Sequence, residues 1–273
     1  MEMDMSPPTD PTFSSIRYLP TNEAYDRWAA VYDTDGNFLQ ALDTIELKTL
    51  FPQFLQSITS PKPWRIVDLG CGTGRNTMLL PTVPDIEEII ALDSSKGMLE
   101  VARSRLQRKC DGVGTSNLEP GRTAPKLNLE VFDMLVSPSP PPSTRQADGV
   151  ISTLVVEHVP LSTFFAHVSQ MLKPGGILLL TNMHAHMGGI SQAGFVDAET
   201  GEKIRPTSYA HTVADVVAEA GRWGLEVEAG EGGKAGVMER AVDEDMVEKL
   251  GPRSRKWIGV TCWFGGLFRK RAN

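Results

Sequence analysis

Cysteine is scarce in this chain, and long apolar runs are missing from it. Only three cysteines occur, Cys71, Cys110 and Cys262, so no disulfide framework can be read and a reduced, cytoplasmic setting is expected. The longest apolar run, residues 177–180, is far too short to cross a bilayer. Residues 1–20 lack the apolar centre of a signal peptide. No membrane partner is expected.

Basic residues are also in deficit. The 273 residues hold 27 Lys and Arg against 34 Asp and Glu, a formal net charge of −7. This balance leaves no basic face to follow a phosphate backbone, so no nucleic-acid partner is expected. The length suits one large domain, and 41% hydrophobic residues suffice for a full core. The sequence does not determine an oligomeric state.

The most informative segment is a glycine-rich turn at residues 70–74, where Gly70, Gly72 and Gly74 alternate. A β-branched, apolar run before it predicts a buried strand that ends beside Asp68. Glycines allow a sharp turn and let a ligand approach the backbone closely, and the N–H groups of a following helix suit a carboxylate or phosphate. A tight turn without any ligand remains the alternative.

Residues at the ends of the later strands help to distinguish between the possible ligands of this turn. A second apolar run ends in Asp93, about 20 residues after the last glycine, where dinucleotide-binding folds hold a ribose with an acidic side chain. However, the dinucleotide fingerprint needs a third glycine where this chain has Arg75. A third strand ends in Asp133, whose carboxylate could accept from an adenine amino group. The pattern favours an adenosyl ligand over NAD.

In order and spacing, five motifs resemble those of the class I S-adenosylmethionine-dependent methyltransferases, specifically the small-molecule type. They lie at residues 67–74, 92–99, 131–134, 152–159 and 171–176. The resemblance implies S-adenosylmethionine as the cofactor and no metal. It also implies a set of cofactor-binding residues, namely Tyr25, Tyr32, Asp68, Gly70, Gly72, Asp93, Ser94, Met98, Asp133, Met134, Thr153 and Leu154.

In that family the two glycines line the methionine part of the cofactor, and Asp68 helps to hold its amino group. Asp93 grips the ribose diol, the pair 133–134 brackets the adenine, and the pair 153–154 passes close to the sulfonium. A tyrosine hydroxyl of the N-terminal helix reaches the methionine carboxylate. Trp28 of the same helix is expected to pack in the core.

Alternating strand and helix patterns predict an α/β fold with right-handed βαβ units. We expect the Rossmann-like class I methyltransferase fold: a seven-stranded, mostly parallel sheet with helices on both faces, of order 3-2-1-4-5-7-6, the last strand antiparallel. The expected strands are 65–69, 87–92, 127–132, 147–152, 177–182, 225–229 and 257–267. The expected helices are 22–58 (broken at 35–37), 74–80, 95–109, 161–172, 208–223 and 243–250.

The domain organisation follows from these elements. Residues 1–20 are expected to be a disordered tail and residues 21–273 a single methyltransferase domain. Within it we expect a lid helix (21–58), a core (64–182), an acceptor-side insertion (183–207) and a C-terminal part (208–273). The insertion holds a predicted hairpin, 194–197 facing 203–206. Ligands of open α/β sheets bind beyond the strand carboxyl ends, so the acceptor site should lie here.

Candidate bases cluster in the same region. His158, His184, His186 and His211 lie at or after strand ends, and Glu157 is a further candidate. An imidazole suits proton removal near neutral pH. A structural role is the alternative for each of them alone, and a His-x-His metal pair is disfavoured because no carboxylate cluster lies nearby in the sequence.

These observations predict methyl transfer from S-adenosylmethionine to O or N of a small organic acceptor, a metabolite. Two alternatives stay open. One is an enzyme that binds the cofactor but catalyses a non-methylating reaction, and the other is a non-catalytic partner subunit with the same fold. The intact glycine turn and its three acidic partners argue against the second.

Overall fold

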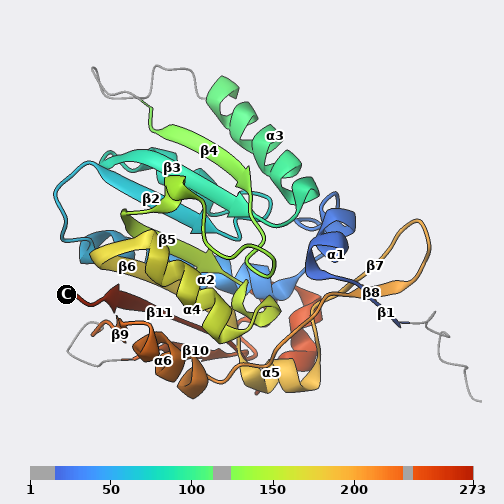
Figure 1. The fold of residues 1–273 in the computed structure, drawn as a ribbon. Helices are drawn as coiled ribbons and strands as arrows, with labels where there is room; N and C mark the ends of the chain where they lie inside the picture. Colours follow the sequence, from blue (N-terminus) through green and yellow to red (C-terminus); the bar gives the residue numbers. More distant parts are fainter. Residues whose placement is uncertain (1–15, 113–123, 230–235, 273) are drawn as a thin grey trace, which may run out of the picture.

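The computed structural model describes residues 16–112, 124–229 and 236–272 and is built on one large sheet. The order of its strands is β10-β11-β6-β5-β2-β3-β4, and β9 also pairs with β11 (Figure 1). These strands are β2 (Trp64–Leu69), β3 (Ile86–Asp93), β4 (Lys126–Val131), β5 (Ala147–Thr153), β6 (Leu172–Met183), β9 (Leu225–Val227), β10 (Met238–Ala241) and β11 (Thr261–Lys270).

Strands β2 to β6 are parallel, and β11 runs antiparallel to β6. The predicted order with a reversed last strand is therefore confirmed. The expectation of seven strands is wrong for the described residues, which form eight. Strand β10 pairs with the first half of β11 and β9 with its last residues, so two short strands share one edge. The sequence of β10, Met-Glu-Arg-Ala, carries no apolar alternation that would reveal it.

Helices cover both faces of the sheet, as predicted (Figure 1). Alternate residues of the central strands point to opposite sides. Ile66 and Ile89 pack with α2 (Phe38–Ser57) on one face, whereas Val67 and Ile90 pack with α4 (Leu161–Met171) and α6 (Val213–Arg222) on the other. Helix α3 (Lys96–Gly112) packs against β3 and β4.

Several elements differ from their predicted bounds. Strand β6 begins at Leu172 because residues 173–176 continue it instead of forming a helix stop. Only short 3-10 helices, η1 (Thr77–Thr82) and η3 (Pro142–Thr144), occupy the segments after the glycine turn and in the proline-rich loop. Helix α7 (Val247–Leu250) is followed by a 3-10 helix, η6 (Pro252–Trp257). Most of the segment between α3 and β4 lies outside the described residues.

The expected N-terminal helix is two helices. Helix α1 (Thr21–Trp28) ends before a turn, and Asn37 caps α2 by accepting a hydrogen bond from the Leu39 N–H at 3.0 Å. Helix α1 lies against the start of α3 and near the carboxyl ends of the parallel strands (Figure 1). It is therefore placed where the predicted lid should be.

A second, three-stranded sheet lies beside α1. The predicted hairpin is present as β7 (Phe195–Val196) and β8 (Lys203–Arg205), and β1 (Ile16–Tyr18) pairs in parallel with β8. The expectation of a disordered tail up to residue 20 is wrong for residues 16–20, because β1 is ordered by its pairing with β8. The sequence does not reveal this strand, since its partner lies far along the chain. Residues 1–15 lie outside the described residues.

No helix among the described residues is long and apolar enough to cross a membrane.

Candidate active site

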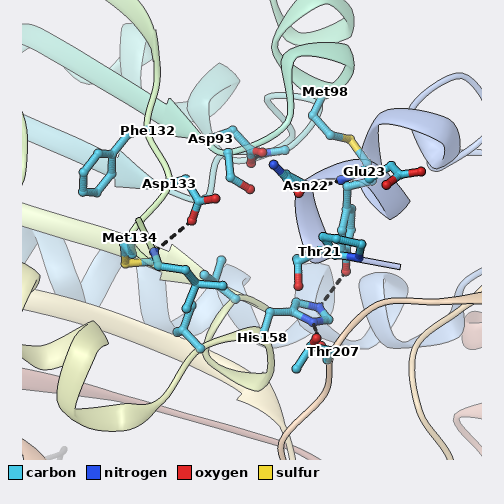
Figure 2. Close-up of a pocket in the computed structure, with 18 of the residues that line it drawn as sticks. Thr21, Asn22, Glu23, Asp93, Met98, Phe132, Asp133, Met134, His158 and Thr207 are labelled. Carbon is cyan, nitrogen blue, oxygen red and sulfur yellow. Dashed lines mark hydrogen bonds between the residues drawn. The ribbon is translucent and has the colours of Figure 1, made fainter. Parts of the chain in front are cut away.

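A cavity of about 810 Å³ opens at the carboxyl ends of the parallel strands. The ends of β2, β3 and β5 contribute Leu69, Asp93 and Thr153 to its wall, and Phe132 follows β4 directly. The opposite wall comes from β1, α1 and the segment after β8 (Figure 2). Its volume is that of a small-molecule site, and its place is the one that the sequence predicted.

The glycine turn forms one wall. Gly70 has φ +75°, and a Cβ there would lie 2.2 Å from Val155 Cγ2. Gly72 has φ +54°, and a Cβ there would meet no atom within 4 Å. Gly70 is required because a side chain there would clash with Val155 and would be strained at a positive φ. Gly72 leaves open space for a ligand. This cradle fits the methionine part of S-adenosylmethionine.

Asp93 supports this turn while it faces the cavity. Its Oδ2 accepts from the Gly72 N–H and its Oδ1 from the Ser95 N–H, both at 2.8 Å. Burial raises the pKa of Asp93 to about 6, although these two hydrogen bonds act in the opposite direction. Ser94 and Met98 follow it in the cavity wall. A ribose diol fits this edge, since a carboxylate oxygen has lone pairs to spare.

The predicted adenine residues lie across the cavity from α1. Asp133 and Met134 both line the wall, beside Phe132 (Figure 2). The Oδ1 of Asp133 accepts from the Leu135 N–H at 2.8 Å, which fixes the carboxylate and leaves Oδ2 to accept from an amino group.

Asp68 is not part of the cavity wall. It is 1% exposed and lies behind the glycine turn, where its Oδ2 accepts from the Thr77 hydroxyl at 2.6 Å. Burial raises the pKa of Asp68 to about 6. Its contact with the cofactor amino group stays a prediction.

Thr153 and Leu154 line the cavity, as expected from their motif. The Thr153 hydroxyl accepts from Asn76 Nδ2 at 2.7 Å. Leu154 has φ 58°, a conformation that is strained for a residue with a branched side chain. Sequence reasoning missed Asn76, because a polar residue after a glycine turn carries no signal of its own.

Helix α1 contributes Tyr25 to the cavity, and the turn after it contributes Tyr32. Their ring centroids lie 5.7 Å apart. Trp28 is 2% exposed, so its predicted burial is confirmed, but it stacks on Phe195 of the hairpin and does not pack against the main sheet. Helix α1 therefore joins the small sheet through Trp28, and the helix and the turn after it each present one tyrosine hydroxyl to the site.

His158 lies at the base of the cavity and bonds two distant segments (Figure 2). Its Nδ1 is 2.7 Å from the Thr207 carbonyl oxygen and its Nε2 is 2.8 Å from the Tyr25 hydroxyl. A carbonyl only accepts, so Nδ1 carries the proton and Tyr25 donates to Nε2 of the neutral ring. Burial raises the pKa of Tyr25 well above its usual value, which keeps this hydroxyl protonated.

Glu157 lies beside that imidazole. Its Oε1 is 3.4 Å from His158 Nε2, and its buried Oε2 has no hydrogen-bond partner among the described residues. Together, Tyr25, His158 and Glu157 can accept a proton at Nε2.

The other predicted histidines lie elsewhere, and the expectation that they approach the transferable methyl is wrong. Residues 185–190 form helix α5 (Ala185–Ile190), which packs on β11. His184 caps it by accepting from the His186 N–H at 3.0 Å, and burial lowers its pKa. His186 is exposed, and its Nδ1 accepts from the Thr261 N–H at 3.4 Å. His211 bonds the Val159 carbonyl oxygen at 2.9 Å and does not line the cavity.

The two histidines were misplaced because the chain turns into a helix after β6 instead of continuing as an extended strand. Sequence reasoning also missed Thr21 and Thr207, which line the cavity. The Thr21 hydroxyl is buried without a hydrogen-bond partner among the described residues. Only the pairing of β1 with β8 brings these two residues to the site.

Within the described ranges, no three His, Cys, Asp or Glu side chains are grouped so that they could hold a metal ion.

Comparisons with known proteins agree with this geometry. Residues 67–180 match the methyltransferase domain family. An uncharacterized methyltransferase of Emericella nidulans is 52% identical over 269 residues, which cover 92% of this chain and 91% of that protein. A trans-aconitate 2-methyltransferase of Acidovorax sp. is 32% identical over 126 residues, 46% of this chain and 41% of the relative.

Among solved structures, the complex of DhpI with SAH has a TM-score of 0.58 at 16% identity and covers 92% of this chain and 95% of its own. The fold and the site define a Rossmann-like, S-adenosylmethionine-dependent enzyme. The chain belongs to the class I S-adenosylmethionine-dependent methyltransferases.

Proposed function

We propose that this enzyme methylates O or N of a small organic acceptor, a metabolite, inside the cavity described above. The observation that carries the proposal is the extent of this cavity. It continues past the residues that suit the cofactor, Gly72, Asp93 and Asp133, to a second region bounded by Thr21 and His158. Residues of this one chain line that region, and its size suits a small molecule.

Bound S-adenosylmethionine supplies an electrophilic methyl group and leaves as a thioether. Residues of the chain would hold it as the motifs suggest: the glycine turn at the methionine part, Asp93 at the ribose and Asp133 at the adenine. Positioning then supplies much of the rate, because methyl transfer is an in-line displacement.

Tyr25 and His158 provide the route for the proton of an O–H or N–H acceptor. The Tyr25 oxygen receives the acceptor's proton while its own proton passes to His158 Nε2. The imidazolium that forms faces Glu157 Oε1 at 3.4 Å, and this carboxylate balances the new charge. Both ring nitrogens of His158 already have partners, so the tyrosine is the group that touches the acceptor.

The test compares Tyr25→Phe and His158→Gln with His186→Gln as the matched control outside the cavity. Once an acceptor screen has given a methylated product, turnover should fall about 10²-fold or more in the first two variants, as for the loss of a general base. The control should keep its turnover. Calorimetry should show near-parental cofactor affinity for His158→Gln, which separates catalysis from binding.

Full turnover of both cavity variants would contradict the proton route. The alternatives for the whole function are separated by the products. Release of one S-adenosylhomocysteine per methylated molecule supports methyl transfer, whereas conversion of an acceptor without S-adenosylhomocysteine would indicate a non-methylating reaction.

A further inference from the structure

The acceptor side of the cavity carries no positive side chain to receive an anion. No Lys or Arg is among the described lining residues of the cavity, whereas Glu23 is, apart from Asp93 and Asp133, which suit the cofactor. The nearby Arg27 pairs with Glu23 at 3.2 Å and with Asp197 at 3.6 Å. Residues 1–15, which precede β1, contain acidic residues but no Lys or Arg.

A further carboxylate lies just outside the described cavity wall. Glu157 lies behind His158, and its buried Oε2 has no hydrogen-bond partner among the described residues. A negative group of the acceptor would therefore meet no cationic side chain in the described wall, while Glu23 lines the cavity and Glu157 lies behind His158. Like charges repel most strongly there, because the effective dielectric constant is low.

Apolar side chains form the entrance and much of the wall. Leu135 and Val136 follow the predicted adenine residues, line the cavity and are 49% and 78% exposed, so they lie at its mouth on that side. Leu19 and Val159 continue the apolar wall inward and are buried. Surfaces of this kind gain free energy by covering an apolar body.

One uncommitted polar group faces this apolar region. The Thr21 hydroxyl is buried and has no hydrogen-bond partner among the described residues (Figure 2). A hydroxyl both donates and accepts. It can therefore bond a neutral hydroxyl, amide or amine of the acceptor at no cost in charge.

We infer that the acceptor is a molecule with an apolar body and no negative charge, carrying a neutral hydroxyl or amine group or a cationic amine. This inference rests on the proposed function and deepens it. It also separates this chain from the relative named as a trans-aconitate 2-methyltransferase, since a tricarboxylate would bring three negative groups into this site.

The test uses three probes with one skeleton: phenylacetamide, phenethylamine and phenylacetate. Their binding to the protein saturated with S-adenosylhomocysteine is measured by calorimetry or ligand-observed NMR. The neutral and cationic probes should bind at least about tenfold more tightly than the carboxylate. Equal or tighter binding of the carboxylate overturns the inference, as does a lack of measurable binding of the other two.

A charge introduced at the mouth sharpens the test. Val136→Lys should reduce the ratio of the affinities for phenylacetamide and phenylacetate by several-fold, and Val136→Gln is the uncharged control. If the ratio of affinities is unchanged in the lysine variant, electrostatic repulsion is not the reason why the carboxylate binds more weakly. The measurement does not depend on methyl transfer, so the proposed function can fail in the acceptor screen while these binding results still stand.

Discussion

At the scale of single residues, Asp93 links the architecture of the site to its ligand. One carboxylate holds the Gly72 and Ser95 amides at 2.8 Å and also faces the cavity. Because burial raises its pKa to about 6, it is a carboxylate at neutral pH and becomes a neutral acid only slightly below it. Cofactor binding should therefore respond to mild acid.

We expect the affinity for S-adenosylmethionine to fall as the pH is lowered through about 6, by at most about tenfold per pH unit. Protonation of Asp93 removes an acceptor oxygen and a negative charge. Calorimetry between about pH 7.5 and about pH 5 measures this dependence. Asp93→Asn should bind about tenfold or more weakly at neutral pH and should show a flatter pH profile.

Asp68→Asn is the control for this experiment, since Asp68 has a similarly raised pKa but lies outside the cavity wall. It should keep the pH dependence of the parent. If cofactor affinity stayed strongly pH-dependent in the Asp93 variant and became independent of pH in the Asp68 variant, Asp68 would be the group that causes the pH dependence.

At the scale of elements, the decisive contact is that of α1 with the start of α3. The Asp26 carboxylate accepts from the Ser95 hydroxyl at 2.6 Å and from the Gly97 N–H at 2.9 Å. A Cβ on Gly97 would lie 3.0 Å from the Asp26 carbonyl oxygen and 3.3 Å from Ala29 Cβ. The close approach that brings Tyr25 over the cavity thus requires a glycine at this position.

Gly97→Ala should push α1 away from α3 and weaken cofactor binding several-fold. Gly221→Ala, on helix α6, is the matched control, because a Cβ there meets no atom within 4 Å. The control should be unchanged or about 0.4–1 kcal/mol more stable, as for Gly→Ala at an unstrained site. Calorimetry and thermal unfolding of both variants give the answer. If the two variants had the same cofactor affinity and the same stability, the contact between α1 and α3 would accommodate the added Cβ, and the prediction would be wrong.

At the scale of the whole molecule, the cavity is assembled from segments that are far apart in the chain. The glycine turn, α1, the end of β5 and Thr207 all contribute to it. A ligand that joins them binds the folded state and not the unfolded chain, so it must raise the stability of the whole domain.

S-adenosylhomocysteine at about a hundredfold excess over its Kd should stabilise the protein by about 2.7 kcal/mol and raise Tm by roughly 5–10 °C. NAD should leave Tm unchanged, because Arg75 stands where the dinucleotide turn needs a glycine. Differential scanning calorimetry with each ligand distinguishes the two. A shift with NAD and none with S-adenosylhomocysteine would contradict the cofactor assignment.

The sequence by itself determined the core of the sheet and its cofactor side. The glycine turn and the acidic strand ends at Asp93 and Asp133 follow from local patterns: apolar runs of strand length, glycines where the backbone must turn, and polar residues where strands stop. The strand order followed from the resemblance of these motifs to the methyltransferase family. The carboxyl ends of neighbouring parallel strands meet at one edge of the sheet. Local patterns therefore suffice to bring these residues together.

Only the tertiary structure decided the acceptor side. Pairing of β1 with β8 brings Thr21 and Thr207 to the cavity, and the turn into α5 carries His184 and His186 away from it. His158 was one candidate base among several in the sequence, and its bonds to Tyr25 and Thr207 are the reason for proposing it. These contacts join residues far apart in the chain, and their free energy depends on three-dimensional packing that no local pattern records.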